Sequence, residues 1–210
     1  MAANNFNTIN ATVKSDPKNH KGRYIIYVKA GVYDKYITVK KNMVNIFMYG
    51  DGRRKTIVTG NKSNREGFST FRTATFSAIG VGFICKSIGF RNTACPEAHQ
   101  AMALHLGLLQ LQNGRLPGQN CKIIVRKPMD NQLNTMTAQG ITQSQRPTGL
   151  VIHNCNIVPE AKLFPMIFKI QTSGRPWKEY SKTVIMESTQ ADFVNPAGWY
   201  PWAGNFALDT

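Results

Sequence analysis

The sequence predicts an all-β fold in which short strands wind into a solenoid of stacked coils. Short runs of β-branched and aromatic residues recur along the chain, with Gly, Asn and Thr at their ends, while long helical periodicity is nearly absent. Weakly similar segments also return at intervals of roughly 20–35 residues, as they do in repeat proteins. A β-sandwich would give many short strands as well and is the alternative.

The expected elements are mostly short strands. Only 6–14 and 97–106 could form helices, and both would be short. The expected strands, which end at turn-forming residues, lie within 23–33, 45–52, 56–61, 75–94, 122–128, 134–140, 148–159 and 182–188.

Two pairs of segments repeat one another and suggest a cysteine bridge. "GFICKSIGF" resembles "GLVIHNCNI", and both "QNCKI" and "HNCNI" contain Asn-Cys-x-Ile. If Cys121 and Cys155 are equivalent on neighbouring coils, their backbones lie about 4.8 Å apart, within the range of about 4.4–6.8 Å that a disulfide requires. We therefore predict that they can form a disulfide in an oxidising compartment. Two buried thiols are the alternative.

Composition and charge limit the classes of function. A length of 210 residues, 42% of them hydrophobic, suits a single domain over 1–210. The net charge of +15 implies an anionic partner, either nucleic acid, acidic membrane or acidic polysaccharide. The basic residues are scattered and no nucleic-acid module is recognisable, which disfavours nucleic acid. There is no transmembrane span, no visible signal peptide and no metal-ligand spacing.

Five segments carry a resemblance to a known family: "RYIIYVKAGVYDKYITVKKNMVNIFMYGDGRRKTIVTGN", "STFRTATFSAIGVGFICKSIGFRNTACPEAHQAMAL", "VRKPMDNQLNTMTAQG", "GRPWKEYSKTVIMES" and "NPAGWYPWAGNFALDT". Together they resemble the plant pectin methylesterases (pectinesterases). The resemblance implies a right-handed parallel β-helix and hydrolysis, without a cofactor, of methyl-esterified homogalacturonan. It further implies secretion to the cell wall, an acidic polysaccharide partner and a protein inhibitor as a second one.

The resemblance also assigns roles to four residues. Arg175, in "GRPW", matches the arginine that holds the catalytic carboxylate, and Trp177 matches an indole lining the sugar groove. Gln100, in "HQAMAL", matches a glutamine that stabilises the oxyanion, a suitable task for a neutral amide donor. Trp199, in "PAGW", matches an aromatic residue of the substrate cleft. The alternatives are an ordinary turn at 175–177, a turn cap at Gln100 and simple packing of Trp199.

The chain departs from the family where its two catalytic aspartates belong. The family carries Gln-Asp-Thr and Asp-Phe-Ile-Phe-Gly motifs, and this sequence contains neither. We expect a β-helix shortened by roughly two coils, with a seam near 108–120 and incomplete ends. Ester hydrolysis needs a nucleophile and a proton donor, so we expect impaired catalysis. The alternatives to an impaired pectinesterase are an inactive polygalacturonate-binding relative and a truncated gene product.

Overall fold

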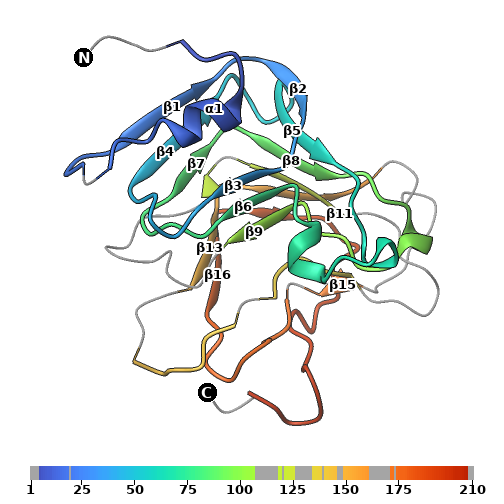
Figure 1. Ribbon diagram of the computed structural model, residues 1–210. Coiled ribbons are helices and arrows are strands. Elements are labelled where there is room, and N and C mark those ends of the chain that lie inside the picture. Colours follow the sequence, from blue (N-terminus) through green and yellow to red (C-terminus); the bar gives the residue numbers. More distant parts are fainter. Residues whose placement is uncertain are drawn as a thin grey trace.

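The chain folds into a stack of β coils in a computed structural model (Figure 1). The structure describes residues 5–18, 20–106, 118–119, 121–125, 134–138, 140–145, 149–160, 171–172 and 174–207. The predicted seam at 108–120 therefore lies outside the described residues, apart from 118 and 119. In Figure 1 the stack runs from the N-terminal coils at the top to the C-terminal coils at the bottom.

Strands follow one another around each coil in a fixed order. Coils 1 to 5 each contribute three strands, and coil 6 contributes two. Coils 1 to 3 contain β1 (Tyr24–Val28), β2 (Gly31–Asp34), β3 (Ile37–Val39), β4 (Ile46–Gly50), β5 (Thr56–Gly60), β6 (Phe76–Ala78), β7 (Ile84–Lys86), β8 (Gly89–Asn92) and β9 (Leu104–Leu106). Coils 4 to 6 contain β10 (Gly118–Gln119), β11 (Lys122–Val125), β12 (Asn134–Thr135), β13 (Leu150–His153), β14 (Asn156–Pro159), β15 (Gln171–Thr172), β16 (Thr183–Met186) and β17 (Thr189–Gln190).

Every recorded strand pair is parallel, and this confirms the parallel β-helix and excludes the sandwich. One sheet runs through all six coils in the order β1-β4-β7-β10-β13-β16. Its register aligns one position from each coil: Ile26, Met48, Cys85, Gly118, Ile152 and Ile185. The side chains of Ile26, Met48, Cys85 and Ile152 are buried in this row. The turn after this sheet also repeats, because Ser87, Asn154 and Glu187 each follow a strand with a positive φ.

On the other two faces of the stack, the strand ladders of coils 1 to 3 and of coils 4 to 6 form separate sheets. On one face the strands pair as β2-β5-β8 and, separately, as β11-β14-β17. On the other they pair as β3-β6-β9 and, separately, as β12-β15. Within the described part of the chain, only the pairing of β10 with β7 joins the two halves by a strand ladder. We call this junction the seam.

Among the described residues, a contiguous cluster of buried apolar side chains lies in the first half. A cluster of buried side chains runs from Ile9 to Ile88, and Phe76 lies at its centre with ring centroids 5.4 Å from Phe83 and 5.0 Å from Phe90. Helix α1 (Ile9–Lys14) buries Ile9 and Val13 against the first coil, and the Thr8 hydroxyl caps its N-terminus. This helix confirms the expectation for 6–14.

The expectation of a helix over 97–106 was wrong. A single 3₁₀ turn, η3 (Pro96–Ala98), is followed by extended chain that becomes β9. Two further 3₁₀ turns, η1 (Asn64–Glu66) and η2 (Thr70–Thr73), lie in the long connection between β5 and β6. None of the described helices has the length and apolar character needed to cross a membrane.

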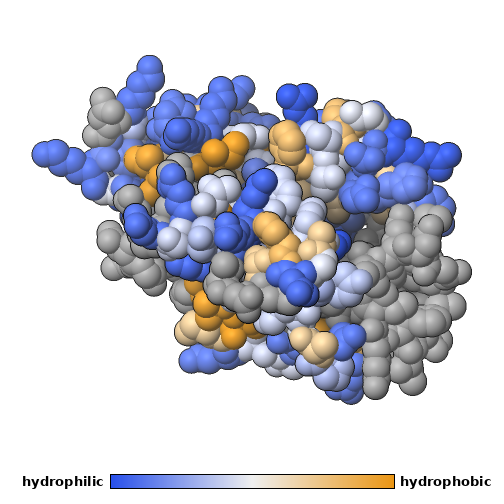
Figure 2. Space-filling view, turned by 90° about the horizontal axis from the view of Figure 1, so that it is seen from below, coloured by the Kyte–Doolittle hydropathy of each residue, from blue (hydrophilic) through white to orange (hydrophobic). Residues whose placement is uncertain are grey.

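The surface mixes polar and apolar side chains. Figure 2, which views the molecule from below, shows apolar side chains in several separate groups among hydrophilic ones. Among the large hydrophobic residues exposed to solvent are four aromatic residues near the C-terminal end, Trp199, Tyr200, Trp202 and Phe206.

Candidate functional site

The predicted site residues of the C-terminal coils are held together by backbone hydrogen bonds. Gly174 forms a parallel bridge with Trp199, and the Tyr200 amide donates to the Gly174 carbonyl at 3.0 Å. The Arg175 amide donates to the Thr137 carbonyl, also at 3.0 Å. Three segments distant in the sequence thus meet near Arg175, and Trp199 lies beside the Gly174–Arg175 segment.

Glycine permits the close approach of these segments. A Cβ atom at Gly174 would collide with the Thr137 hydroxyl and lie 2.8 Å from the Trp199 ring. A Cβ atom at Gly140 would lie 3.0 Å from the ring of Trp177. Trp177 is 47% exposed and Trp199 is 50% exposed, so both indoles present area to solvent. Their accessibility suits the stacking of a sugar ring.

The Arg175 guanidinium is occupied by the C-terminal loop. Its Nη2 donates to the carbonyl oxygens of Trp202 at 2.8 Å and Pro201 at 3.3 Å. Its central carbon lies 4.7 Å from the ring centroid of Trp202 and 5.2 Å from that of Tyr200, both cation–π distances. Its Nε is buried without a hydrogen-bond partner. The arginine that the resemblance assigns to a carboxylate is thus held here by carbonyls and aromatic rings.

A cavity of about 190 Å³ opens beside this arginine. Its lining has one cationic side chain, three hydroxyl groups and two aromatic rings, and none of the described residues that line it is acidic. The lining residues are Arg175, Pro176, Ser181, Thr183, Trp199, Tyr200, Pro201 and Ala207. Such a lining can accept an anion or the polar edge of a sugar, but it offers no carboxylate nucleophile.

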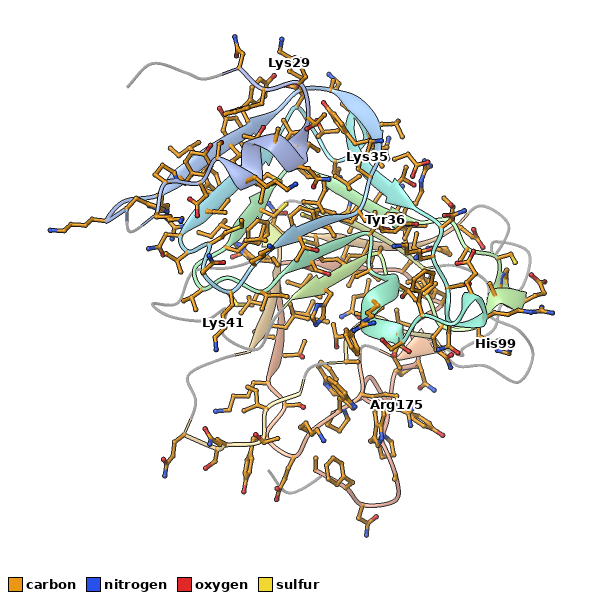
Figure 3. The ribbon with its side chains drawn as sticks, viewed as in Figure 1. Lys29, Lys35, Tyr36, Lys41, His99 and Arg175 are labelled. Atoms are coloured by element: carbon orange, nitrogen blue, oxygen red, sulfur yellow. The ribbon has the colours of Figure 1, made fainter. Side chains whose placement is uncertain are left out.

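Gln100 lies apart from this cluster. It is exposed, it precedes β9 in coil 3, and its carbonyl accepts a hydrogen bond from the Asn64 amide at 2.9 Å. Arg175 follows β15 in coil 5, and coil 4 lies between them. His99, the neighbour of Gln100 in the chain, and Arg175 are visibly separate in Figure 3. The structure therefore brings together Arg175 and Trp199 but does not bring Gln100 to them.

The cysteine pair has the predicted stacking but no bond. Because Lys122 pairs with Asn156, Cys121 and Cys155 precede equivalent positions on coils 4 and 5. The Cys121 amide donates to the Cys155 sulfur at 3.4 Å. The structure holds both residues as thiols. The equivalence is confirmed, and the disulfide itself stays a prediction.

Sequence reasoning missed the aromatic partners of Arg175. Tyr200 and Trp202 belong to "WYPW", and this run of aromatic residues beside a predicted cleft residue was the signal that could have identified them. No group of three or more His, Cys, Asp or Glu suited to a metal ion occurs in the part of the chain that the structure describes.

Comparisons with known proteins agree with the fold. The family model described as Pectinesterase matches residues 2–108 and 112–210, so its match is interrupted at the predicted seam. The chain is 42% identical to "Putative pectinesterase/pectinesterase inhibitor 45" of Arabidopsis thaliana over 98% of its own length and 40% of that protein. It is 38% identical to a pectinesterase of Daucus carota over 98% of its length and 76% of that protein.

Solved structures place the chain in the same group. The solved pectin methylesterase from carrot matches with a TM-score of 0.71 and 37% identity, covering 97% of this chain and 76% of that one. The pectin methylesterase from Aspergillus niger shares the fold at 20% identity and a TM-score of 0.62. The chain spans about two fifths of the length of the Arabidopsis relatives. A family model that covers nearly all of the sequence, together with these relatives, shows that the chain belongs to the pectinesterase family.

Proposed function

We propose that this chain binds homogalacturonan at the Arg175 cavity and that its hydrolysis of the methyl esters is strongly impaired. Family membership supports the choice of polymer. The surplus of 26 basic over 11 acidic residues favours attraction to a polyanion. The exposed indole of Trp199 lines the cavity together with Arg175, and the exposed indole of Trp177 stands two residues after Arg175 in the chain.

The occupied guanidinium carries the proposal of impairment. Arg175 contacts the carbonyls of Pro201 and Trp202, and its cavity has no acidic side chain among the residues that the structure describes. The sequence also contains neither aspartate motif of the family. Loss of a nucleophile costs about 10⁴–10⁶ in rate, because only binding and oxyanion effects are left. Binding does not need that nucleophile, so affinity for the polymer can outlast catalysis.

The proposed oligosaccharide ligand, protein inhibitor and place of action rest on family membership. A solved pectin methylesterase that shares the fold was obtained in complex with a hexasaccharide, which supports an oligosaccharide ligand for this fold. Curated relatives are named pectinesterase/pectinesterase inhibitor, which supports a protein inhibitor as a second partner. We extend the proposal to the cell wall as the place of action, where the polymer is found.

Methanol release from highly methylated pectin tests the catalytic part. The purified chain is compared with the carrot enzyme at equal concentration, and circular dichroism on the same sample confirms β structure. We expect a rate lower by about 10⁴-fold or more. Activity within about a hundredfold of the carrot enzyme would overturn the proposal and point to a substitute carboxylate.

Binding to polygalacturonate tests the site. We expect the double variant Arg175→Ala, Trp177→Ala to bind at least about tenfold more weakly, because it loses the cation and an exposed ring face. Lys41→Ala is the matched control, since it removes one exposed positive charge far from the cavity (Figure 3). Equal losses in the two proteins would show that bulk charge alone attracts the polymer.

A further inference from the structure

The strands β1, β4 and β7 have an outer surface that is largely apolar. Ile26, Met48 and Cys85 are buried in the core, and side chains alternate across a strand, so the neighbours of these three residues point outward. The strand register aligns the outward residues in two rows, Ile25, Phe47 and Ile84 in one and Tyr27, Tyr49 and Lys86 in the other. We call the surface formed by these six residues the aromatic face.

The rings of the aromatic face form one platform that solvent reaches. Ile25 is 61% exposed and Tyr27 is 49% exposed, and Phe47 and Tyr49 are half-buried. The ring centroids of Tyr27 and Tyr49 lie 5.2 Å apart. Those of Phe47 and Tyr49 lie 5.7 Å apart, with the ring planes 22° from parallel. A contiguous exposed apolar surface of this kind is typical of a binding site.

Hydrogen bonds within the chain hold one edge of the platform in place. The Tyr27 hydroxyl donates to Oδ1 of Asp51 at 2.6 Å, and the Ala30 amide donates to Oδ2, also at 2.6 Å. Both carboxylate oxygens of Asp51 are therefore engaged. Because the Tyr27 ring is already fixed, a ligand that packs on it loses less affinity to the ordering of side chains.

Positive charges border the aromatic face. Apart from Asp51, the charged residues at the outward positions of these strands and at their ends are Arg23, Lys29 and Lys86. The Arg23 Nη1 donates to the Gly82 carbonyl at 3.1 Å, which places the guanidinium beside the start of β7. Lys29 and Lys86 are exposed, and no carboxylate among the described residues forms an ion pair with either. Both ammonium groups can therefore meet an anionic ligand.

We propose that the aromatic face is a second polysaccharide-binding surface, which recognises the unesterified galacturonate residues of an acidic polysaccharide. A pyranose ring has a face of C–H bonds that packs on an aromatic ring. Each unesterified galacturonate also carries one carboxylate at the edge of its ring, where a cation can pair with it. A platform of rings with cations at its border matches that arrangement. The choice of galacturonate rests on the proposed function, whereas the surface itself is independent of the Arg175 cavity.

The aromatic face is separate from the Arg175 cavity. It belongs to coils 1 to 3, whereas Arg175 follows β15 in coil 5. In Figure 3, Lys29 lies at the top of the molecule and Arg175 lies toward the bottom. Two surfaces on one chain can bind separate stretches of one polymer, and the second contact then forms at a high effective concentration. Loss of either surface should therefore weaken binding to a long polymer more than binding to a short oligomer.

Hydroxyl-radical footprinting of the unaltered chain tests the proposal. The chain is oxidised with and without polygalacturonate, and tandem mass spectrometry assigns the oxidation to single residues. Trypsin releases β1 in peptide 24–29 and β4 in peptide 42–53. Peptide 30–35 is the internal control, because it carries the exposed Val32 on β2, another face of the stack. With saturating polymer, we expect the rings of the first two peptides to oxidise at least about twofold more slowly, since bound sugar excludes solvent, and the control to be unchanged.

Other ligands and conditions decide what the aromatic face recognises. Highly methylated pectin should protect it less, because esterification removes the carboxylates, and equal protection would overturn the recognition of unesterified residues. Equal protection by random DNA would show a general surface for polyanions and would overturn the recognition of a sugar. Protection that rises with protein concentration without polymer would show a second copy of the chain on this face and would overturn the proposal. No protection of 24–29 and 42–53 by polygalacturonate would do the same.

Variants measure how much the aromatic face contributes. Tyr27→Ala together with Tyr49→Ala should weaken binding to polygalacturonate by at least about tenfold, because it removes two rings of the platform. Circular dichroism confirms that the variant is folded. Lys86→Ala should weaken binding more than its matched control Lys35→Ala, which removes an exposed charge from the connection between β2 and β3. Equal effects of the two lysine variants would show that bulk charge acts rather than the border of this face.

The Arg175→Ala, Trp177→Ala variant separates this proposal from the proposed function. At saturating polygalacturonate, protection of peptide 24–29 should persist in that variant. If it persists and the variant binds as tightly as the wild type, binding at the Arg175 cavity is wrong and the aromatic face stands. If protection of 24–29 is lost with the Arg175 cavity, the aromatic face is not a binding surface of its own and this proposal is wrong.

Discussion

At the scale of the residue, His105 makes stability depend on pH. It lies on β9 in register with Ser77, and its ring centroid is 6.5 Å from that of Phe71. Burial lowers the pKa of His105, so the folded chain binds fewer protons at this site than the unfolded chain does. Stability therefore rises with pH between the folded pKa and about 6.5, and it falls on acidification through that window.

The prediction is a flatter pH profile in His105→Gln. Urea unfolding between about pH 7.5 and pH 5 should show a smaller loss of unfolding free energy than in the wild type, because the variant lacks the half-buried imidazole whose protonation favours unfolding. His99→Asn is the control. It removes the imidazole of an exposed residue that lies outside β9. If the unfolding free energies of wild type and His105→Gln changed with pH in the same way, His105 would not be the cause of the pH dependence.

The candidate site was partly predictable at this scale. "GRPW" and "PAGW" identified Arg175 and Trp199, and the structure places both on one cavity. The partners of the guanidinium could not be predicted, because the carbonyls of Pro201 and Trp202 are backbone atoms that every residue carries. Gln100 was assigned through its motif, but its distance from Arg175 depends on which coils stand between them.

At the scale of the element, Asn92 shows why the predicted helix over 97–106 does not form. Its side-chain amide lies within hydrogen-bonding distance of the carbonyls of Lys62, Thr73 and Met102 at 2.8–3.2 Å. Its Oδ1 accepts from the Ala94 amide at 2.9 Å. These bonds, with the ladder between β9 and β6, hold the segment extended. Helix propensity is a weak preference that tertiary contacts of this kind override.

Replacing Asn92 with alanine should strongly destabilise this region. The change removes the four hydrogen bonds of this side chain, one of them to the buried Thr73 carbonyl, and we expect a loss of about 3 kcal/mol in the free energy of unfolding. Chemical denaturation measures it. Asn64→Ala is the matched control, since that exposed amide makes one bond, to the Phe68 carbonyl at 3.0 Å, and should cost about 1 kcal/mol or less. If both variants lost a similar amount of unfolding free energy, the hydrogen bonds of Asn92 would not be what holds the segment extended.

At the scale of the whole molecule, the repeat pattern predicted the solenoid but not how unevenly it is stabilised. The similar segments at 82–90 and 149–157 became β7–β8 and β13–β14, equivalent parts of coils 3 and 5. Yet the contiguous apolar cluster belongs to α1 and the first three coils. Hydrophobic residues occur along the whole chain, and their positions in the sequence do not reveal which of them are buried together. That depends on how the coils stack.

This asymmetry predicts that the two halves open separately. In a solenoid each coil contacts only its neighbours, so a weak interface divides the molecule into units of different stability. Among the described residues, the first half holds the contiguous apolar cluster, and one short strand pairing crosses the seam. In moderate urea, amides of β4, β5, β7 and β8 should therefore exchange hydrogen at least about tenfold more slowly than those of β13, β14 and β16. Hydrogen exchange followed by peptide mass spectrometry under reducing conditions measures both sets in one sample, so each half serves as the reference for the other. Equal exchange in the two sets would mean that β7 and β10 transmit enough stability across the seam for all six coils to unfold together.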